Sequence, residues 1–206
     1  MSNLAEKLAT GVALMGLPVS LETQEVLLQY LALLDKWNKV YNLTAVRKPS
    51  EMITLHLLDS LSVLPYIKSK NLLDVGSGGG LPGIVLAVCL PELQVTTIDT
   101  VQKKAIFMRQ VKGELGLDNL NVVHARVERF EPEDPFEAII SRAFSEINVF
   151  MALTQHLLIE GGCWFAMKGV SPNQELEELG IKVSKVFPLS VAGLDAERHL
   201  AVIEKF

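Results

Sequence analysis

The sequence has few cysteines and no long apolar run. Its 206 residues include two cysteines, Cys89 and Cys163, and neither belongs to a CxxC pair or a Cys/His cluster. This excludes a disulfide scaffold and argues against structural zinc, so we expect no metal site. The longest apolar run, 84–90, has seven residues, whereas a membrane span needs roughly 20. The first seven residues are too polar for a signal peptide, which predicts a soluble, cytoplasmic protein.

The sequence also lacks an excess of positive charge. It has 19 Lys and Arg against 24 Asp and Glu, a net charge of −5. This argues against a protein that coats nucleic acid without specificity, although it permits a local basic patch. Apolar residues make up 49% of the chain, enough to bury a core, which excludes disorder for the bulk of it. The length suits one domain with a modest extension, and we expect a monomer.

Up to about residue 70, apolar residues recur at helical spacing, and we predict a helical N-terminal extension over residues 1–70. The first helix contains residues 4–15 and ends at the Gly-Leu-Pro of 16–18. The second begins after Ser20, a plausible N-cap, and runs through Trp37. A loop over 42–48 leads to a third helix that opens at Pro49 and closes near Pro65.

After residue 70, short β-rich runs alternate with helical ones. We predict strands at 72–75, 95–98, 121–124, 136–141 and 162–167, with helices at 84–90, 101–115 and 148–159. Two late strands, near 181–187 and 199–204, are expected to pair as an antiparallel edge. This order is typical of an α/β, Rossmann-like fold over residues 71–206, with a mostly parallel seven-stranded sheet and helices on both faces.

A glycine loop after the first strand is the strongest local signal. An acid at the end of that strand precedes three glycines at every second position, Asp74-x-Gly76-x-Gly78-x-Gly80, and Asp99 ends the next strand. Such a loop lets a ligand touch the backbone, and the acid after the second strand can hold ribose hydroxyls. The spacing fits both a dinucleotide and S-adenosylmethionine (SAM). Pro82 is awkward within a dinucleotide helix, so SAM is favoured.

Two further turns bear on the cofactor and on the methyl acceptor. Val127-Glu128 follows the third strand, where adenine lies in a SAM fold, and Arg142 follows the fourth, where the transferred methyl lies. The Pro-Pro-aromatic signature of amine methylation is absent after the fourth strand, and Cys163 is expected to be a core residue and not a nucleophile. An acceptor that is already nucleophilic, such as guanine N7, remains. Small molecules and proteins stay open as alternatives.

A nucleic-acid substrate needs a basic rim. Basic residues gather near the carboxyl ends of the predicted strands and in the N-terminal loop. We predict RNA contacts from Arg47, His56, Lys104, Lys168 and Arg198. His56 also shares a helix face with Asp59 and Ser60.

Together, five segments resemble the bacterial ribosomal RNA small subunit methyltransferase G family, also called glucose-inhibited division protein B. They are Trp37-Asn38-Lys39-Val40-Tyr41-Asn42-Leu43-Thr44, His56-x-x-Asp59-Ser60, the loop 74–83, Ile140-Ser141-Arg142-Ala143 and Glu197-Arg198-His199. The similarity runs over nearly the whole chain. The family loop often has proline where this chain has Gly79.

The resemblance implies a class I SAM-dependent methyltransferase that modifies N7 of one guanine, guanine 527 in standard bacterial numbering, in 16S ribosomal RNA of the small subunit. It further implies that Gly76 and Leu81 contact SAM, that Val127 and Glu128 contact adenine, and that Arg142 lies beside the methionine moiety or the target guanine. Arg142 is therefore the candidate catalytic residue and also a candidate cofactor ligand. An NAD-dependent oxidoreductase and a non-catalytic ribosome-assembly binder remain as alternatives.

Overall fold

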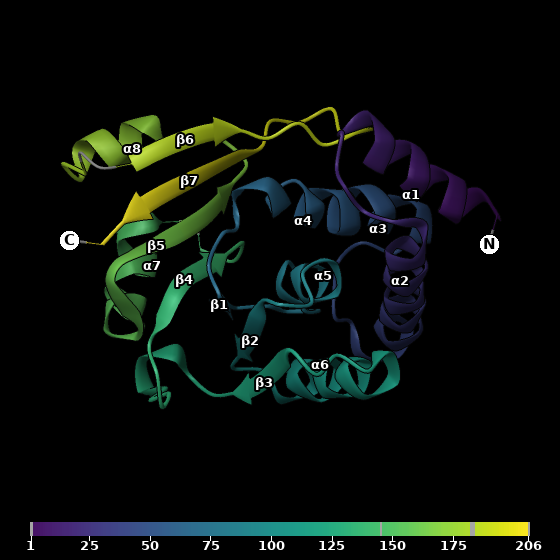
Figure 1. Ribbon diagram of the computed structural model, residues 1–206, viewed down its shortest axis with the longest axis horizontal. Coiled ribbons are helices and arrows are strands. Elements are labelled where there is room, and N and C mark those ends of the chain that lie inside the picture. The colour runs from purple at the N-terminus through teal and green to yellow at the C-terminus, as the bar shows by residue number, and fades with distance from the viewer. Residues whose placement is uncertain (1, 145, 182–183, 206) are drawn as a thin grey trace.

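The protein is built around a seven-stranded sheet. The structure is a computed structural model and describes residues 2–144, 146–181 and 184–205. The strand order is β3-β2-β1-β4-β5-β7-β6, in which β1 to β5 are parallel and β7 is antiparallel to both neighbours (Figure 1). The strands are β1 (Asn71–Val75), β2 (Gln94–Asp99), β3 (Leu120–His124), β4 (Phe136–Ser141), β5 (Leu158–Lys168), β6 (Ser184–Pro188) and β7 (His199–Glu204).

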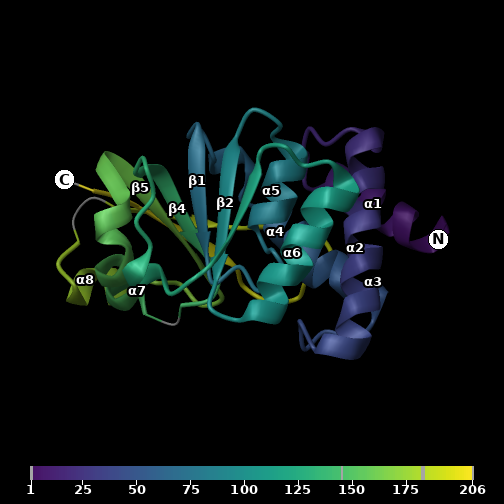
Figure 2. The same ribbon diagram turned by 90° about the horizontal axis from the view of Figure 1, so that it is seen from below.

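Helices cover both faces of the sheet. They are α1 (Ser2–Leu14), α2 (Leu21–Tyr41), α3 (Pro49–Met52), α4 (Asp59–Leu61), α5 (Gly83–Cys89), α6 (Gln102–Leu115), α7 (Ile147–Thr154) and α8 (Asn173–Glu178). Figure 2 shows α7 on one side of the sheet and α5 and α6 on the other, with α1 and α2 as an outer layer beyond them. The predicted fold class is confirmed.

Local signals place several helix ends where the sequence predicts them. The Ser20 side chain accepts a hydrogen bond from Thr23 N–H at the start of α2, which satisfies one free donor of the first turn. Gly116 ends α6 in the left-handed region, with φ of 64°. The loop after α2 is tied by Asn38, which accepts from Thr44 N–H and donates to the Val46 carbonyl, both at 2.9 Å.

The helix predicted from Pro49 to Pro65 is interrupted. A π-helix, Ile53–Leu58, separates α3 from α4, and a 3-10 turn, Leu64–Tyr66, follows. His56, Asp59 and Ser60 therefore do not lie on one regular α-helix, although His56 and Asp59 still line the same cavity. A π-turn adds one residue and shifts the side chains around the axis.

Several elements after β4 also differ from the prediction. The helix predicted over 148–159 ends at Thr154, passes through a 3-10 turn and is followed by β5, which starts at Leu158 and not at residue 162. Pairing of Phe136 with Leu158, across a register shift, extends the strand backwards. Helix α8 was not predicted. The predicted strand over 181–187 is observed as β6, and residues 182–183 lie outside the described residues.

The N-terminal helices and the sheet share one hydrophobic core. Leu8 of α1, Leu34 of α2 and Leu57 of the π-helix belong to the same buried cluster as Leu72 of β1 and Phe107 of α6. The division of the chain at residue 70 into a helical extension and an α/β domain stays a prediction. No helix in the described part of the chain has the length and apolar character to cross a membrane.

Candidate functional site

The glycine loop follows β1 at the carboxyl ends of the parallel strands. Gly76, with φ of +70°, passes so close to the loop after β4 that a Cβ there would lie 2.7 Å from Ala143 Cβ. Gly80 has φ of +90°, and a Cβ there would lie 2.2 Å from Ile84 Cδ1. Tyr30 of α2 donates to the Gly79 carbonyl at 2.6 Å, so the helical extension supports the loop directly.

Asp74 anchors the glycine loop through buried hydrogen bonds. It is fully buried, and its Oδ2 accepts from Gly83 N–H at 2.9 Å, while Ser77 Oγ donates to its backbone carbonyl at 2.8 Å. Burial raises the pKa of Asp74 to about 7. Among the described residues, its Oδ1 has no partner. Asp74 therefore orients the backbone of the glycine loop, and it does not line the cavity next to that loop.

Asp99 joins the glycine loop to the end of β2. Its Oδ2 accepts from Gly78 N–H and its Oδ1 from Val101 N–H, both at 2.9 Å, and Lys104 Nζ lies 3.5 Å from Oδ2. Asp99 lines a cavity of about 340 Å³ together with Gly76. The predicted juxtaposition of the loop and this carboxylate is observed, and we call this space the loop cavity.

The far wall of the loop cavity comes from the turns after β3 and β4. Ala125, Val127 and Glu128 line it on one side and Ala143 and Phe144 on another. Val127 is buried, and Glu128 forms an ion pair with Arg126 at 3.6 Å. The turn proposed for adenine thus faces the same cavity as Asp99. Gly78, Gly80 and Leu81 shape the loop without lining this cavity.

A second cavity, of about 410 Å³, lies at the carboxyl end of β5. Basic side chains from distant parts of the chain gather there, and we call it the arginine cavity. They are His56, Arg142, Lys168, Arg198 and His199. The pairing of Lys168 with His199 in the antiparallel β5–β7 ladder brings the start of β7 to this end of the sheet.

One carboxylate lies between the two arginines of this cavity. Arg142 Nη1 donates to Asp59 Oδ2, and Arg198 Nε donates to Asp59 Oδ1, both at 2.9 Å. Lys168 pairs with Glu175 of α8 at 3.0 Å. Glu175 also accepts from Ile147 N–H at the start of α7. These ion pairs therefore fix the positions of Arg142, Arg198 and Lys168 in the cavity.

The loop after β4 contributes to both cavities. Ser141 Oγ donates to the Val75 carbonyl at 2.7 Å and accepts from Ala143 N–H at 3.1 Å, which ties this loop to β1. Arg142 lines the arginine cavity, and the next residue, Ala143, lines the loop cavity. Consecutive residues of one loop therefore line the two cavities.

His56 is buried in the wall of the arginine cavity. Its Nε2 lies 2.9 Å from Thr44 Oγ1, and its Nδ1 has no partner among the described residues. Burial, helped by the Arg142 guanidinium, lowers the pKa of His56 to about 4. The imidazole is therefore neutral near pH 7, and it can bind RNA through a hydrogen bond and not through charge.

The substitution His56→Gln is expected to reduce the loss of stability on acidification. The unfolded histidine, with a pKa near 6.5, takes up a proton that the folded one resists until about pH 4. The free energy of unfolding therefore keeps its full value above about pH 6.5. It falls as the pH drops toward 4, by at most roughly 3 kcal/mol from this histidine. Urea unfolding of both proteins between those pH values measures it.

Asp74 acts in the opposite direction, because its raised pKa favours the folded state as pH falls from about 7. Its contribution is common to wild type and variant, so the difference between them reports His56 alone. His156→Gln, at an exposed position, is the matched control. Equal acid sensitivity of wild type and His56→Gln would contradict the assignment.

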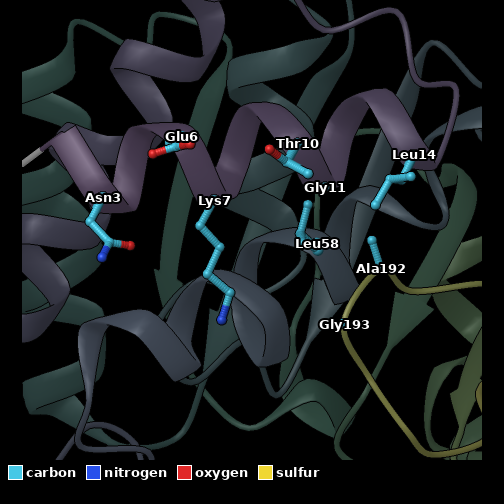
Figure 3. Close-up of a pocket in the computed structure, with 9 residues that line it drawn as sticks. All are labelled: Asn3, Glu6, Lys7, Thr10, Gly11, Leu14, Leu58, Ala192 and Gly193. Atoms are coloured by element: carbon cyan, nitrogen blue, oxygen red, sulfur yellow. The ribbon is translucent and has the colours of Figure 1, made fainter.

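A third cavity, of about 410 Å³, lies away from both of these. It is bounded by α1, by Leu58 of the π-helix and by the turn at Gly193 (Figure 3). The π-helix therefore presents Leu58 to this third cavity and His56 to the arginine cavity.

Within the described residues, no group of His, Cys, Asp and Glu side chains could hold a metal ion.

Two predicted RNA contacts lie outside the arginine cavity. Lys104 lines the loop cavity beside Asp99. Arg47 is exposed on the loop after α2, where it donates to Asn42 Oδ1 at 2.8 Å and to the Asn38 carbonyl at 3.3 Å. His56, Lys168 and Arg198 do lie together with Arg142. RNA contact by any of these five remains a prediction.

Sequence reasoning did not assign three residues that organise the site. Asp59 binds two arginines, Glu175 binds Lys168, and Tyr30 supports the glycine loop. Asp59 did stand out, because it is part of the motif shared with His56 and Ser60. Glu175 and Tyr30 carry no local signal, since each acts on a segment far away in the chain.

Comparison with known proteins identifies the family. The profile of the rRNA small subunit methyltransferase G family, GidB, matches residues 23–201. A protein named ribosomal RNA small subunit methyltransferase G from Methylobacillus flagellatus is 62% identical over 200 residues, which cover 97% of this chain and 98% of that protein. A protein of the same name from Azoarcus sp. is 53% identical over 204 residues, covering 98% of this chain and 96% of that protein.

Solved structures share the fold at low sequence identity. An O-methyltransferase from Bacillus cereus in complex with SAH has a TM-score of 0.62 and 18% identity, covering 96% of this chain and all of that one. A SAM-dependent methyltransferase from Aquifex aeolicus has a TM-score of 0.57 and 20% identity, with 76% and 94% covered. The fold is that of the class I SAM-dependent methyltransferases. The relatives lend no support to the oxidoreductase or the non-catalytic binder. By its profile match and its close relatives along nearly the whole length, the chain belongs to the ribosomal RNA small subunit methyltransferase G family.

Proposed function

We propose that this protein transfers a methyl group from SAM to N7 of a single guanine, guanine 527, in 16S ribosomal RNA of the small subunit. The observation that carries the proposal is the pair of cavities joined by consecutive residues. Arg142 faces a cavity rich in cations, and Ala143 faces one with a carboxylate and a glycine loop. The first suits the phosphates of RNA, and the second suits a nucleoside.

The loop cavity has the chemistry that SAM requires. Asp99 can accept from ribose hydroxyls, the turn at Val127 and Glu128 can bind the adenine edge, and Gly76 lets the ligand approach the backbone. At about 340 Å³, the cavity is within the range of ligand sites. Bound SAM supplies an electrophilic methyl group. Asp74, Ser77 and Tyr30 keep the loop in place by the hydrogen bonds described above.

The acceptor chemistry places few demands on the protein. Guanine N7 has a lone pair and no proton, so its attack on a methyl group requires no general base. Burial raises the pKa of the Cys163 thiol. This residue lines a different cavity, together with Glu137 near the start of β4. Cys163 therefore does not serve as the nucleophile in our proposal. The task left to Arg142 and Arg198 is to hold the nucleotide in line with the methyl group, and alignment of this kind can supply roughly 7–11 kcal/mol of a barrier.

The proposal predicts one labelled nucleotide. Small subunits from cells that lack the family's enzyme are incubated with the protein and with SAM labelled in its methyl group, beside naked 16S RNA. Strand scission specific for N7-methylguanine is expected to map the label to guanine 527 of the subunit. Subunits from wild-type cells, already modified, are the control and should take up little label.

The result separates the alternatives. Label at another atom or nucleotide would contradict the proposed acceptor and leave a methyltransferase. Absence of label on both substrates, with SAM still bound, would contradict ribosomal RNA methylation altogether.

A further inference from the structure

We propose that Asp59 is a positioning residue, which fixes Arg142 and Arg198 as a rigid pair of guanidinium groups facing the target nucleotide. This inference deepens the proposed function and rests on it for the identity of the substrate. The acidic residue contacts neither RNA nor cofactor in this scheme. Its carboxylate acts through the two arginines that it binds.

The burial of Asp59 supports this role. Its side chain is 3% exposed, whereas the side chains of Arg142 and Arg198 are 29% and 26% exposed. Both carboxylate oxygens are used, one by each arginine at 2.9 Å. All three residues line the arginine cavity, and the carboxylate is the most deeply buried of the three charged groups. A buried carboxylate that lost its partners would be strongly unfavourable, so the arrangement holds all three groups in place.

The π-helix supplies a second anchor for Arg142. In a regular α-helix the Leu55 carbonyl would accept from Asp59 N–H. Here Asp59 N–H donates to the carbonyls of Thr54 and His56, and Arg142 Nη1 donates to the Leu55 carbonyl at 3.0 Å. One nitrogen of Arg142 is thus shared between a side chain and a backbone group of the same turn. The extra residue of the π-turn has a specific use at this site.

The charge balance suits an anionic ligand. Two arginines share one carboxylate, so the trio keeps a net positive charge at the cavity. No described residue accepts a hydrogen bond from Nε or Nη2 of Arg142, and this residue lines the cavity. Guanidinium donors held in a fixed orientation can bind phosphate oxygens or the guanine O6 acceptor with little loss of side-chain entropy.

Kinetics of Asp59→Asn test the proposal. The amide keeps the shape of the carboxylate but presents a donor to one of the guanidinium groups. We expect kcat/KM for small subunits to fall on the order of 10- to 100-fold, while the Kd for SAM stays within about threefold because Asp59 does not line the loop cavity. Glu160→Gln removes a carboxylate from an exposed ion pair with Lys205 and should change neither value.

A double-mutant cycle separates positioning from a general structural role. In an Arg142→Ala/Arg198→Ala background, Asp59→Asn should lower kcat/KM by less than about a further threefold, because the two arginines that Asp59 positions are absent. An undiminished loss in that background, a parallel loss of SAM binding, or full activity of Asp59→Asn would each overturn the inference. Asp59→Glu, which keeps the charge, should retain more activity than Asp59→Asn, and it replaces the latter if that variant does not fold.

A readout without turnover makes the inference independent of the proposed acceptor. In ¹⁵N NMR, the Arg198 Nε–H should be protected from exchange in the wild type and lose that protection in Asp59→Asn. Lack of protection in the wild type would contradict the geometry itself. Wild-type protein that fails to methylate subunits would contradict the proposed function and leave the NMR result to decide the role of Asp59.

Discussion

Arg142→Ala is expected to lower kcat for methylation of small subunits on the order of 100-fold, with the affinity for SAM changed by less than about threefold. Arg142 is held by Asp59 and the Leu55 carbonyl and faces the arginine cavity. Loss of its guanidinium leaves the target nucleotide free to shift, and a misplacement of about 1 Å can cost roughly that factor in rate. Single-turnover kinetics with saturating SAM measure the chemical step directly.

The matched control is Arg109→Ala, an exposed arginine of α6 that lines none of the cavities described here. It should methylate subunits at the wild-type rate. Calorimetric titration with SAM completes the test. A large loss of SAM affinity in Arg142→Ala would place this residue beside the methionine moiety, which is the other position that the family resemblance allows. Full activity would remove Arg142 from the site.

Asp99→Ala is expected to weaken SAM binding on the order of 100-fold or more. Its carboxylate accepts from Gly78 N–H and Val101 N–H, and in our proposal it also accepts from the ribose. Each hydrogen bond to a charged group contributes roughly 1.5–3 kcal/mol, and about 1.4 kcal/mol is a factor of ten in affinity. Alanine removes the ribose ligand and also releases the glycine loop, so both effects act on the same Kd.

Titration calorimetry with SAM, and separately with NAD, measures this effect. Asp118→Ala, an exposed acid in the turn before β3, is the control and should bind SAM like the wild type. Thermal unfolding establishes that Asp99→Ala is folded. Unchanged SAM affinity in the variant would remove Asp99 from the cofactor site. Tight binding of NAD and not SAM by the wild type would restore the dinucleotide interpretation of the glycine loop.

The loop cavity was predictable because the sequence motifs that form it are local. Asp74, the glycines and Asp99 lie at the ends of two neighbouring parallel strands, and strands in such a sheet end at a common edge. The same holds for Ser20 and Gly116, whose helix ends depend on nearby atoms alone. A single sequence carries this information in a few adjacent residues.

The arginine cavity was predictable only in part because its contacts are long-range. Asp59 is 83 residues from Arg142 and 139 from Arg198, and no local pattern encodes either pairing. The start of β5 was missed for a similar reason: Leu158 is in the sheet because Phe136 pairs with it. The π-turn was missed because a single extra residue does not alter the apolar spacing that predicted the helix.

The antiparallel strand β7 sets an order in which the two cavities can form during synthesis. The described residues that line the loop cavity all lie between Val75 and Leu153, whereas the arginine cavity also needs Arg198 and His199. A nascent chain that has exposed its first four strands and α7 already contains every described residue of the loop cavity. Until β7 inserts beside β5, it has Arg142 without the partner on the other side of Asp59. In our proposal, the growing chain therefore holds all residues of its cofactor site well before it holds all residues of its RNA site.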